Sequence, residues 1–260
     1  MKEYFETALT AAQSAGAYIQ ESLHQLKEVD HKGRADMVTN VDTTAEQIIV
    51  DHILEHYPDH EILAEESEHT ERPGDVRWII DPLDGTTNYV HGYQHYCVSI
   101  AVQINQVTEI GVVYDPWAPE LFSAIRGQGA YVNNSPLEVS QTASLTESLL
   151  CTGMPYDSSG IEWHLSMELF RLFYGRTHGV RRDGSAALDL SYTAAGRFDG
   201  FWEYALNPWD VAAGLLILTE AGGTISNMDG SSVDIFGGSF LATNGNIHEE
   251  MLEIIRLVTG

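Results

Sequence analysis

The chain has 260 residues, 43% of them hydrophobic and 20% charged, which is enough to bury a sizeable core as one domain or as two closely packed halves. Its 38 acidic and 13 basic side chains give a formal net charge of −25, which argues against nucleic acid as the main ligand because a phosphate backbone requires basic surface. No segment approaches the roughly 20 apolar residues that cross a bilayer. The first residues carry acids and no apolar signal segment, so we expect a cytoplasmic protein with no membrane partner.

The N-terminal part of the chain predicts two helices and then a sheet. Apolar residues at three- and four-residue spacing indicate an amphipathic helix over about 5–26. After a loop around 32–36, a second helix is expected over 43–56, with Asp42 as its N-cap. A polar loop is expected over 68–75. Short runs rich in β-branched residues predict a largely antiparallel sheet from strands at 62–64, 78–80, 98–104, 109–114, 121–125 and 130–132.

The C-terminal part alternates strands and helices, which favours a layered α/β arrangement. The expected strands are 149–153, 179–182, 198–204, 223–226 and 240–243. The expected helices are 162–173, 186–195, 210–220 and 247–258. We therefore expect an α+β half over 1–135 carrying Glu65, Asp81 and Asp84, and an α/β half over 136–260 carrying Asp210, packed as one compact unit.

The segment 78–88 carries the clearest chemistry. An apolar strand delivers Asp81 and Asp84 at its end, and Gly85 allows the backbone to approach a ligand closely. Carboxylate oxygens are the ligands that Mg²⁺ prefers, and a helix beginning near Thr86 would offer free amides to a phosphate. The alternative is a well-made turn with a helix cap.

Two further acids follow the same pattern, at the end of an apolar strand and at the start of a helix. Glu65 follows the strand 62–64, and Asp210 precedes the apolar helix 211–220. Each has an ordinary structural alternative, a solvent-facing glutamate and a helix cap. Cys97 and Cys151 lie far apart without metal-binding spacing or a basic neighbour, so we interpret them as buried apolar residues rather than nucleophiles.

Three segments in this order resemble the signatures of the inositol monophosphatase family of Mg²⁺-dependent, lithium-sensitive phosphatases. They are Glu65-Glu66-Ser67, Asp81-Pro82-Leu83-Asp84-Gly85-Thr86-Thr87-Asn88, and Trp209-Asp210-Val211-Ala212-Ala213-Gly214 followed by Glu220-Ala221-Gly222-Gly223. The resemblance covers residues 35 to 245. It implies a layered αβαβα sandwich with the metals at the junction of two halves, and commonly a homodimer.

The resemblance also implies a role for individual residues. Two or three Mg²⁺ ions would be held by the carboxylates and one carbonyl of Glu65, Asp81, Leu83, Asp84 and Asp210. Asp42 matches an acid near a third, weaker ion, and a plain N-cap is its alternative. A water held by Glu65 and the Thr86 hydroxyl would attack phosphorus in line with the leaving oxygen. The substrate would contact Gly85, Thr86, Gly184, Ser185, Ala186, Glu203 and Asp210.

The substrate that the resemblance suggests first is inositol monophosphate. Fructose 1,6-bisphosphate, NADP and 3′-phosphoadenosine phosphates remain alternatives on the same fold, and a protein-binding regulator is an alternative of another class. The complete set of implied ligands argues against a regulator that has lost catalysis. Asp183 either alters polyol preference or caps the following helix, and Arg181 and Arg182 either meet a second phosphate or pair with local acids. His91 and His95 are interpreted as packing or surface residues.

Overall fold

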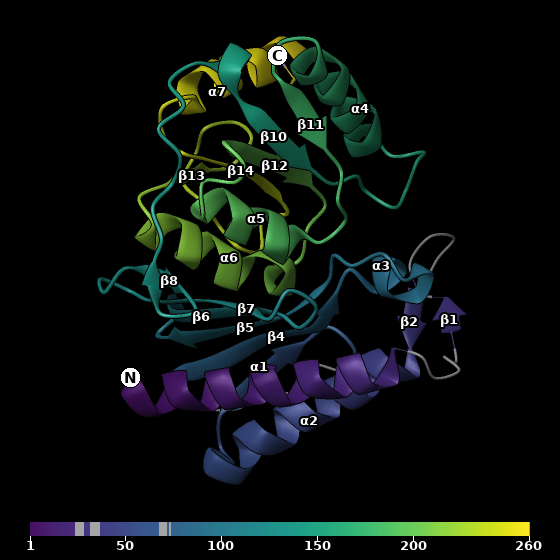
Figure 1. Cartoon of the computed structure of the whole chain (residues 1–260), viewed down its shortest axis with the longest axis vertical. Helices are drawn as coiled ribbons and strands as arrows, with labels where there is room; N and C mark the ends of the chain where they lie inside the picture. Colours follow the sequence, from purple (N-terminus) through teal and green to yellow (C-terminus); the bar gives the residue numbers. More distant parts are fainter. Residues whose placement is uncertain (24–28, 32–36, 68–71, 73, 260) are drawn as a thin grey trace.

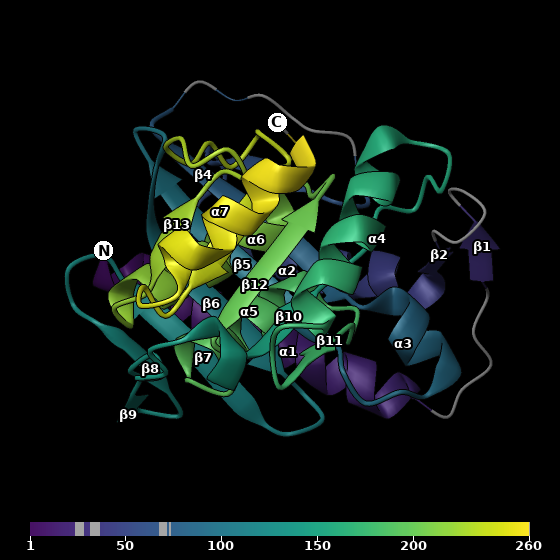
Figure 2. The same ribbon diagram turned by 90° about the horizontal axis from the view of Figure 1, so that it is seen from above.

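A computed structural model describes residues 1–23, 29–31, 37–67, 72 and 74–259 of the chain. Figure 1 shows five layers: two helices, a sheet, two helices, a second sheet and two outer helices. This arrangement confirms the layered αβαβα sandwich. The view from above in Figure 2 shows the two outer helices, α4 and α7, crossing over the strands of the second sheet.

The first layer consists of α1 (Lys2–Ser22) and α2 (Asn40–His56), which pack on each other and on the first sheet. Alanines spaced along one face of α1 are fully buried, so the two helices approach closely. A short antiparallel pair, β1 (Val29–His31) and β2 (Met37–Thr39), precedes α2 and was not predicted. The loop expected around 32–36 and most of the loop expected over 68–75 lie outside the described residues.

The first sheet has the order β3-β4-β5-β6-β7-β8-β9 and confirms the largely antiparallel prediction. Only the β3–β4 pair is parallel. Its strands are β3 (Glu61–Ala64), β4 (Val76–Asp84), β5 (Cys97–Ile104), β6 (Val107–Asp115), β7 (Glu120–Ile125), β8 (Ala130–Val132) and β9 (Ser135–Pro136). β4 continues past the predicted strand because Asp84 still pairs with Cys97 beyond a register shift. Such a bulge bends the strand and redirects its side chains.

The second sheet has the order β11-β10-β12-β14-β13. Its strands are β10 (Leu149–Thr152), β11 (Gly179–Arg181), β12 (Gly200–Tyr204), β13 (Thr224–Ser226) and β14 (Ser239–Thr243). The outer helices are α4 (Ile161–Tyr174) and α7 (His248–Thr259), and a 3₁₀ turn, η1 (Leu145–Glu147), precedes β10. Each predicted strand and helix of this part is present, within a few residues of its expected ends.

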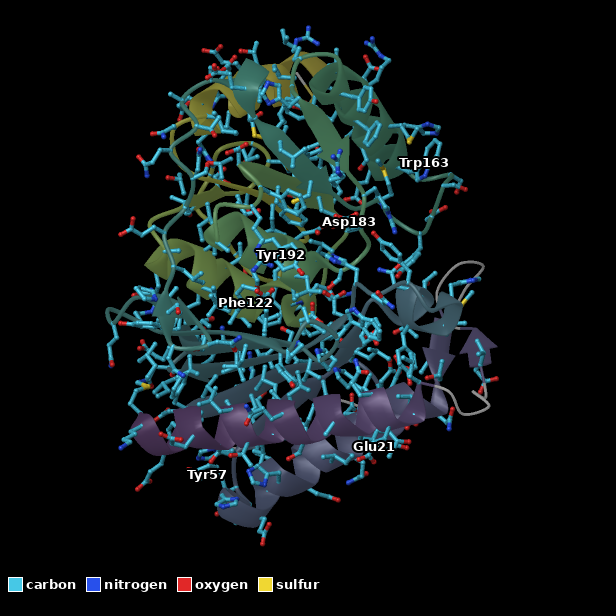
Figure 3. The ribbon with its side chains drawn as sticks, in the orientation of Figure 1. Glu21, Tyr57, Phe122, Trp163, Asp183 and Tyr192 are labelled. Carbon is cyan, nitrogen blue, oxygen red and sulfur yellow. The ribbon has the colours of Figure 1, made fainter. Side chains whose placement is uncertain are left out.

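The middle layer, α5 (Ala186–Ala194) and α6 (Pro208–Glu220), is covered on both sides by the sheets. α6 is apolar nearly all round, as a helix without a solvent face must be. A Cβ on Gly111 of β6 would lie 2.7 Å from the Ala213 carbonyl, so this glycine allows the sheet and α6 to touch. Tyr192 of α5 and Phe122 of β7 also meet here, with ring centroids 5.9 Å apart (Figure 3).

Both cysteines are free and fully buried, as predicted. No helix among the described residues is long and apolar enough to cross a membrane. The division of the chain at residue 135 into two halves stays a prediction.

Candidate active site

One cavity of about 160 Å³ opens between the end of the first sheet and the middle helices. Eleven of the residues expected at the site line it, from both parts of the chain: Glu65, Asp81, Leu83, Asp84, Gly85, Thr86, Gly184, Ser185, Ala186, Glu203 and Asp210. Arg182 is also in the wall, and Asp42 lies behind Thr86. The fold therefore gathers segments that are more than 140 positions apart in the sequence.

The turn at the end of β4 fixes the two aspartates. The Leu83 amide donates to Asp81 Oδ1 at 3.0 Å, and Asp84 Oδ2 accepts from the Ser185 hydroxyl and the Ala187 amide, both at 2.7 Å. Gly85 then takes a left-handed conformation, φ 96°, as α3 (Thr86–His91) begins. A Cβ there would meet the His95 carbonyl at 2.9 Å, so only glycine fits this turn.

Glu65 is held at the end of β3, beside β4. Its amide donates to the Ile80 carbonyl at 3.2 Å. The next amide, that of Glu66, donates to Oε2 of Glu46 at 2.8 Å. Glu46 is 5% exposed on α2 and was not singled out in the sequence. In the sequence, Glu46 looks like any other polar residue of a helix. Its role in holding the Glu66 amide follows only from its burial in the structure.

Asp210 and Asp42 occupy equivalent positions, each the third residue of a helix. α6 begins at Pro208, and Asp210 Oδ2 accepts from the Asn207 amide at 2.7 Å, so Asp210 closes a capping box rather than preceding the helix.

The prediction that Asp42 is the N-cap of α2 is wrong. Thr39 is the cap, and Asp42 accepts from the Thr39 amide at 2.9 Å as the third helical residue. The other oxygen of Asp42 accepts from the Thr86 hydroxyl at 2.6 Å. Thr86 Oγ1 also lies 3.0 Å from the Leu83 carbonyl.

Burial and mutual repulsion raise the pKa of the cavity carboxyls. The pKa of Asp81 is well above its usual range because of burial first and then the charges of Glu65, Asp84 and Asp210. The pKa of Asp210 is also well above its usual range, because of burial first and then the charge of Asp84. The pKa of Asp84 is raised by burial, against the hydrogen bonds from Ser185 and Ala187.

These acids fit a divalent cation, because hard oxygen donors in a buried acidic pocket gain most from an added positive charge.

The loop before α5 forms the opposite wall. Asn88 Nδ2 donates to the carbonyls of His95 and Asp183, each at 2.7 Å, and so ties α3 to this loop. Figure 3 shows Asp183 on the side of the upper layers that faces α3. The alternative that Asp183 caps the next helix is wrong, since Ser185 is the N-cap and accepts from the Leu188 amide at 3.4 Å.

A buried histidine–aspartate pair behind this wall was missed by the sequence analysis. His95 Nε2 lies 3.4 Å from Asp189 Oδ1, and the two residues are 6% and 1% exposed. Burial raises the pKa of Asp189 to about 7 although the histidine opposes the rise. Contact with Asp189 raises the pKa of His95 despite its burial. His95 is thus a packing residue with a charge partner, and His91 is exposed.

Glu203 projects from the fourth residue of β12 and is 9% exposed. Its pKa is raised well above the usual range by burial and then by Asp189, while Arg182 acts in the opposite direction. Burial likewise raises the pKa of both cysteine thiols, which excludes either as a ready thiolate nucleophile.

Known proteins that are similar to this chain point to one family. The sequence model of the inositol monophosphatase family matches residues 1–259. An inositol-1-monophosphatase of Synechocystis is 46% identical over 98% of this chain and 89% of its own, and the Nus factor SuhB of Escherichia coli is 43% identical over 98% and 97%. The solved inositol monophosphatase of Anabaena superposes with a TM-score of 0.90 at 42% identity, covering 99% of this chain and 96% of that one. The chain belongs to the inositol monophosphatase family, whose members are Mg²⁺-dependent phosphomonoester hydrolases.

Proposed function

We propose that this protein hydrolyses inositol monophosphate to inositol and phosphate with two or three Mg²⁺ ions. The observation that carries the proposal is the convergence of Glu65, Asp81, Asp84 and Asp210, from three separate stretches, on one cavity. Burial raises the pKa of Asp81 and Asp210, and the charges of neighbouring cavity acids add to the rise, so the site gains stability when cations enter. The ions would be held by these carboxylates and the Leu83 carbonyl.

The chain's own groups would orient the attack. Bound divalent ions lower the pKa of water and offset negative charge on the phosphoryl oxygens. The single hydroxyl proton of Thr86 is engaged by Asp42 or the Leu83 carbonyl, which leaves Thr86 Oγ1 as an acceptor toward the cavity. A water donating to this oxygen and to Glu65 would be aligned for attack on phosphorus. The amides of Gly85 and Thr86 would hold the phosphoryl oxygens.

The opposite wall would recognise the alcohol. Glu203 offers an acceptor to substrate hydroxyls, and a polyol presents a donor at each of them. The segment Gly184, Ser185 and Ala186 lies beside it in the same cavity. Arg182 in the same wall would favour a second anionic group, which keeps fructose 1,6-bisphosphate, NADP and 3′-phosphoadenosine 5′-phosphate as alternative substrates.

A regulatory role is a second candidate, because a relative 43% identical is named Nus factor SuhB. The complete acid set supports catalysis in this chain, whichever partners it binds. We also propose a cytoplasmic homodimer that does not bind nucleic acid directly. Sedimentation equilibrium would test the dimer, and the net charge of −25 supports the absence of direct nucleic acid binding.

The deciding experiment is phosphate release from inositol 1-phosphate, the three alternative substrates and p-nitrophenyl phosphate, with and without Mg²⁺. Asp84→Asn should lower turnover by about two orders of magnitude or more, because an uncharged amide is a poor ligand for Mg²⁺. Asp115→Asn is the control, since Asp115 is a buried aspartate whose Oδ1 accepts from the amides of Trp117 and Ala118 away from the cavity.

Mg²⁺-dependent turnover that disappears in Asp84→Asn and persists in Asp115→Asn would support the chemistry, and the order of the substrates would give the specificity. Lithium should inhibit by competing for a magnesium position. Turnover that is unchanged in Asp84→Asn would exclude the proposed metal ligands. A folded protein silent on all five substrates would favour the regulatory candidate.

A further inference from the structure

Gly153 directly follows the last residue of β10, next to the strand that carries Glu203. β10 and β12 lie side by side (Figure 2). They are parallel, with Thr152 opposite Trp202, so the next pair in register is Gly153 and Glu203. Paired residues of neighbouring strands direct their side chains to the same face. Gly153 is buried and lines the cavity together with Glu203.

The Glu203 carboxylate occupies the space that a side chain at 153 would require. A Cβ built on Gly153 would lie 1.8 Å from Glu203 Oε1, 2.1 Å from Cδ and 2.2 Å from Oε2. All three atoms belong to one carboxylate, and none belongs to the backbone. The nearest obstacle to any residue other than glycine at 153 is therefore the Glu203 carboxylate, which such a residue would displace.

Other glycines of the molecule are needed for different reasons. Gly85 and Gly184 have φ values of 96° and 89°, which other residues rarely adopt. A Cβ on Gly111 would collide with the backbone of α6. Gly153 has neither constraint, since its φ is not positive and the obstacle is the end of a flexible side chain.

We propose that Gly153 is a specificity-determining position that places the Glu203 carboxylate against the base of the cavity for contact with substrate hydroxyls. Gly153 contacts no reacting atom. Its lack of a side chain leaves the space that the Glu203 carboxylate occupies. The inference rests on the proposed function in one respect, the contact of Glu203 with a polyol. The effect of position 153 is then confined to polyol phosphates, because a phosphate ester without alcohol hydroxyls does not use Glu203.

The test is a double-mutant cycle with Gly153→Ala, Glu203→Ala and both together, assayed on inositol 1-phosphate and p-nitrophenyl phosphate. Gly153→Ala should lower kcat/KM for inositol 1-phosphate by about tenfold or more, the usual effect of losing a hydrogen bond to a charged group, mainly through KM. Hydrolysis of p-nitrophenyl phosphate should change by no more than about twofold. In the Glu203→Ala background, Gly153→Ala should have no further effect on either substrate, because the displaced group is gone.

Gly175→Ala is the matched control, since Gly175 ends α4 in a right-handed conformation and a Cβ there would meet nothing closer than 3.6 Å. It should leave both activities unchanged. Equal losses on the two substrates in Gly153→Ala, or a loss that persists in the Glu203→Ala background, would overturn the inference.

Thermal unfolding of the same four proteins separates this inference from the proposed function. If Gly153→Ala lowers the melting temperature and the double variant recovers it relative to Glu203→Ala, the two positions are coupled whatever the substrate is. If the drop persists in the double variant, Gly153 serves the fold and the inference fails. If the wild-type protein does not prefer inositol 1-phosphate, the proposed substrate fails while this unfolding cycle still decides the coupling.

Discussion

The Thr86 hydroxyl donates a hydrogen bond of 2.6 Å to Oδ1 of Asp42, which joins the first turn of α3 to the first turn of α2. The other carboxylate oxygen of Asp42 accepts from the amide and the hydroxyl of Thr39, at 2.9 and 2.5 Å. Both oxygens of Asp42 thus have protein donors. Its position therefore accounts for the orientation of Thr86 without a metal ion beside it.

Asp42→Ala should lower kcat and leave the Mg²⁺ concentration for half-maximal rate unchanged, because it frees Thr86 without removing a metal ligand. The lost capping-box hydrogen bond and the unpaired Thr86 and Thr39 donors should cost about 1–3 kcal/mol of unfolding free energy. A magnesium titration of the rate and urea unfolding measure the two effects. Asp51→Ala, at an exposed aspartate on the same helix, is the control. Rescue of Asp42→Ala by high Mg²⁺ would instead identify Asp42 as a ligand of a third ion.

Asn88 joins the phosphate side of the cavity to the alcohol side through its Nδ2, which donates to the carbonyls of His95 and Asp183. Asn88→Ala should cost about 1–3 kcal/mol of stability because two partly buried carbonyls lose their donor. Asn88→Asp should be worse, since its carboxylate would face the same carbonyl oxygens without a proton to donate. Urea unfolding and kcat/KM measure both variants. Asn246→Ala, at an exposed site, is the control and should leave stability and kcat/KM unchanged. Equal losses in Asn88→Ala and Asn88→Asp would contradict the role of Nδ2 as the donor that joins the two walls.

Local signals in the sequence predicted most strands and helices, and the resemblance to a known family singled out the acids that line the cavity. Apolar runs define the strands, and Asp81, Asp84 and Glu65 follow such runs directly. The assignment of the α2 cap failed because Thr39 and Asp42 are both cap-type residues, and only the backbone shows which one precedes the helix. Pairs such as His95 with Asp189 could not be predicted, since no spacing relates residues on a loop and a helix 94 positions apart.

Removal of Mg²⁺ should destabilise the protein more as the pH rises. Asp81, Asp84 and Asp210 have raised pKa values in the folded, metal-free protein, mainly through burial. Between the ordinary carboxyl pKa of 3.8 and the raised values, the folded state keeps protons that the unfolded state has lost, so stability falls with pH across that window. Mg²⁺ binds the deprotonated acids and offsets this loss.

The rise in melting temperature on adding Mg²⁺ should therefore be larger at pH 8 than at pH 5, and much smaller at both in Asp84→Asn. Differential scanning fluorimetry with EDTA or Mg²⁺ measures the four conditions. A shift that is the same at both pH values would mean that the ions do not bind at these carboxylates.

Asp189 makes a second contribution to the fall in stability with rising pH. Mg²⁺ should not remove this contribution. Burial raises its pKa from 3.8 to about 7, the opposing effect of His95 being weaker, and the charges of Asp183 and Asp84 add to the rise. The folded protein thus holds this proton between about pH 4 and pH 7 while the unfolded chain releases it. The free energy of unfolding should decline across that range for this reason alone. Contact with Asp189 also raises the pKa of His95, so the two residues titrate as one pair.

Asp189→Asn does not titrate, so the contribution of this pair should vanish in the variant. In EDTA, the unfolding free energy of Asp189→Asn should fall less steeply between pH 4.5 and pH 7 than that of the wild type, while Asp51→Asn keeps the wild-type slope. Urea unfolding at four pH values measures the slopes, and NMR titration of the His95 ring should show its pKa falling in the variant. Parallel slopes would mean that Asp189 is already ionised at pH 4.5, with its charge balanced by the protonated His95 beside it.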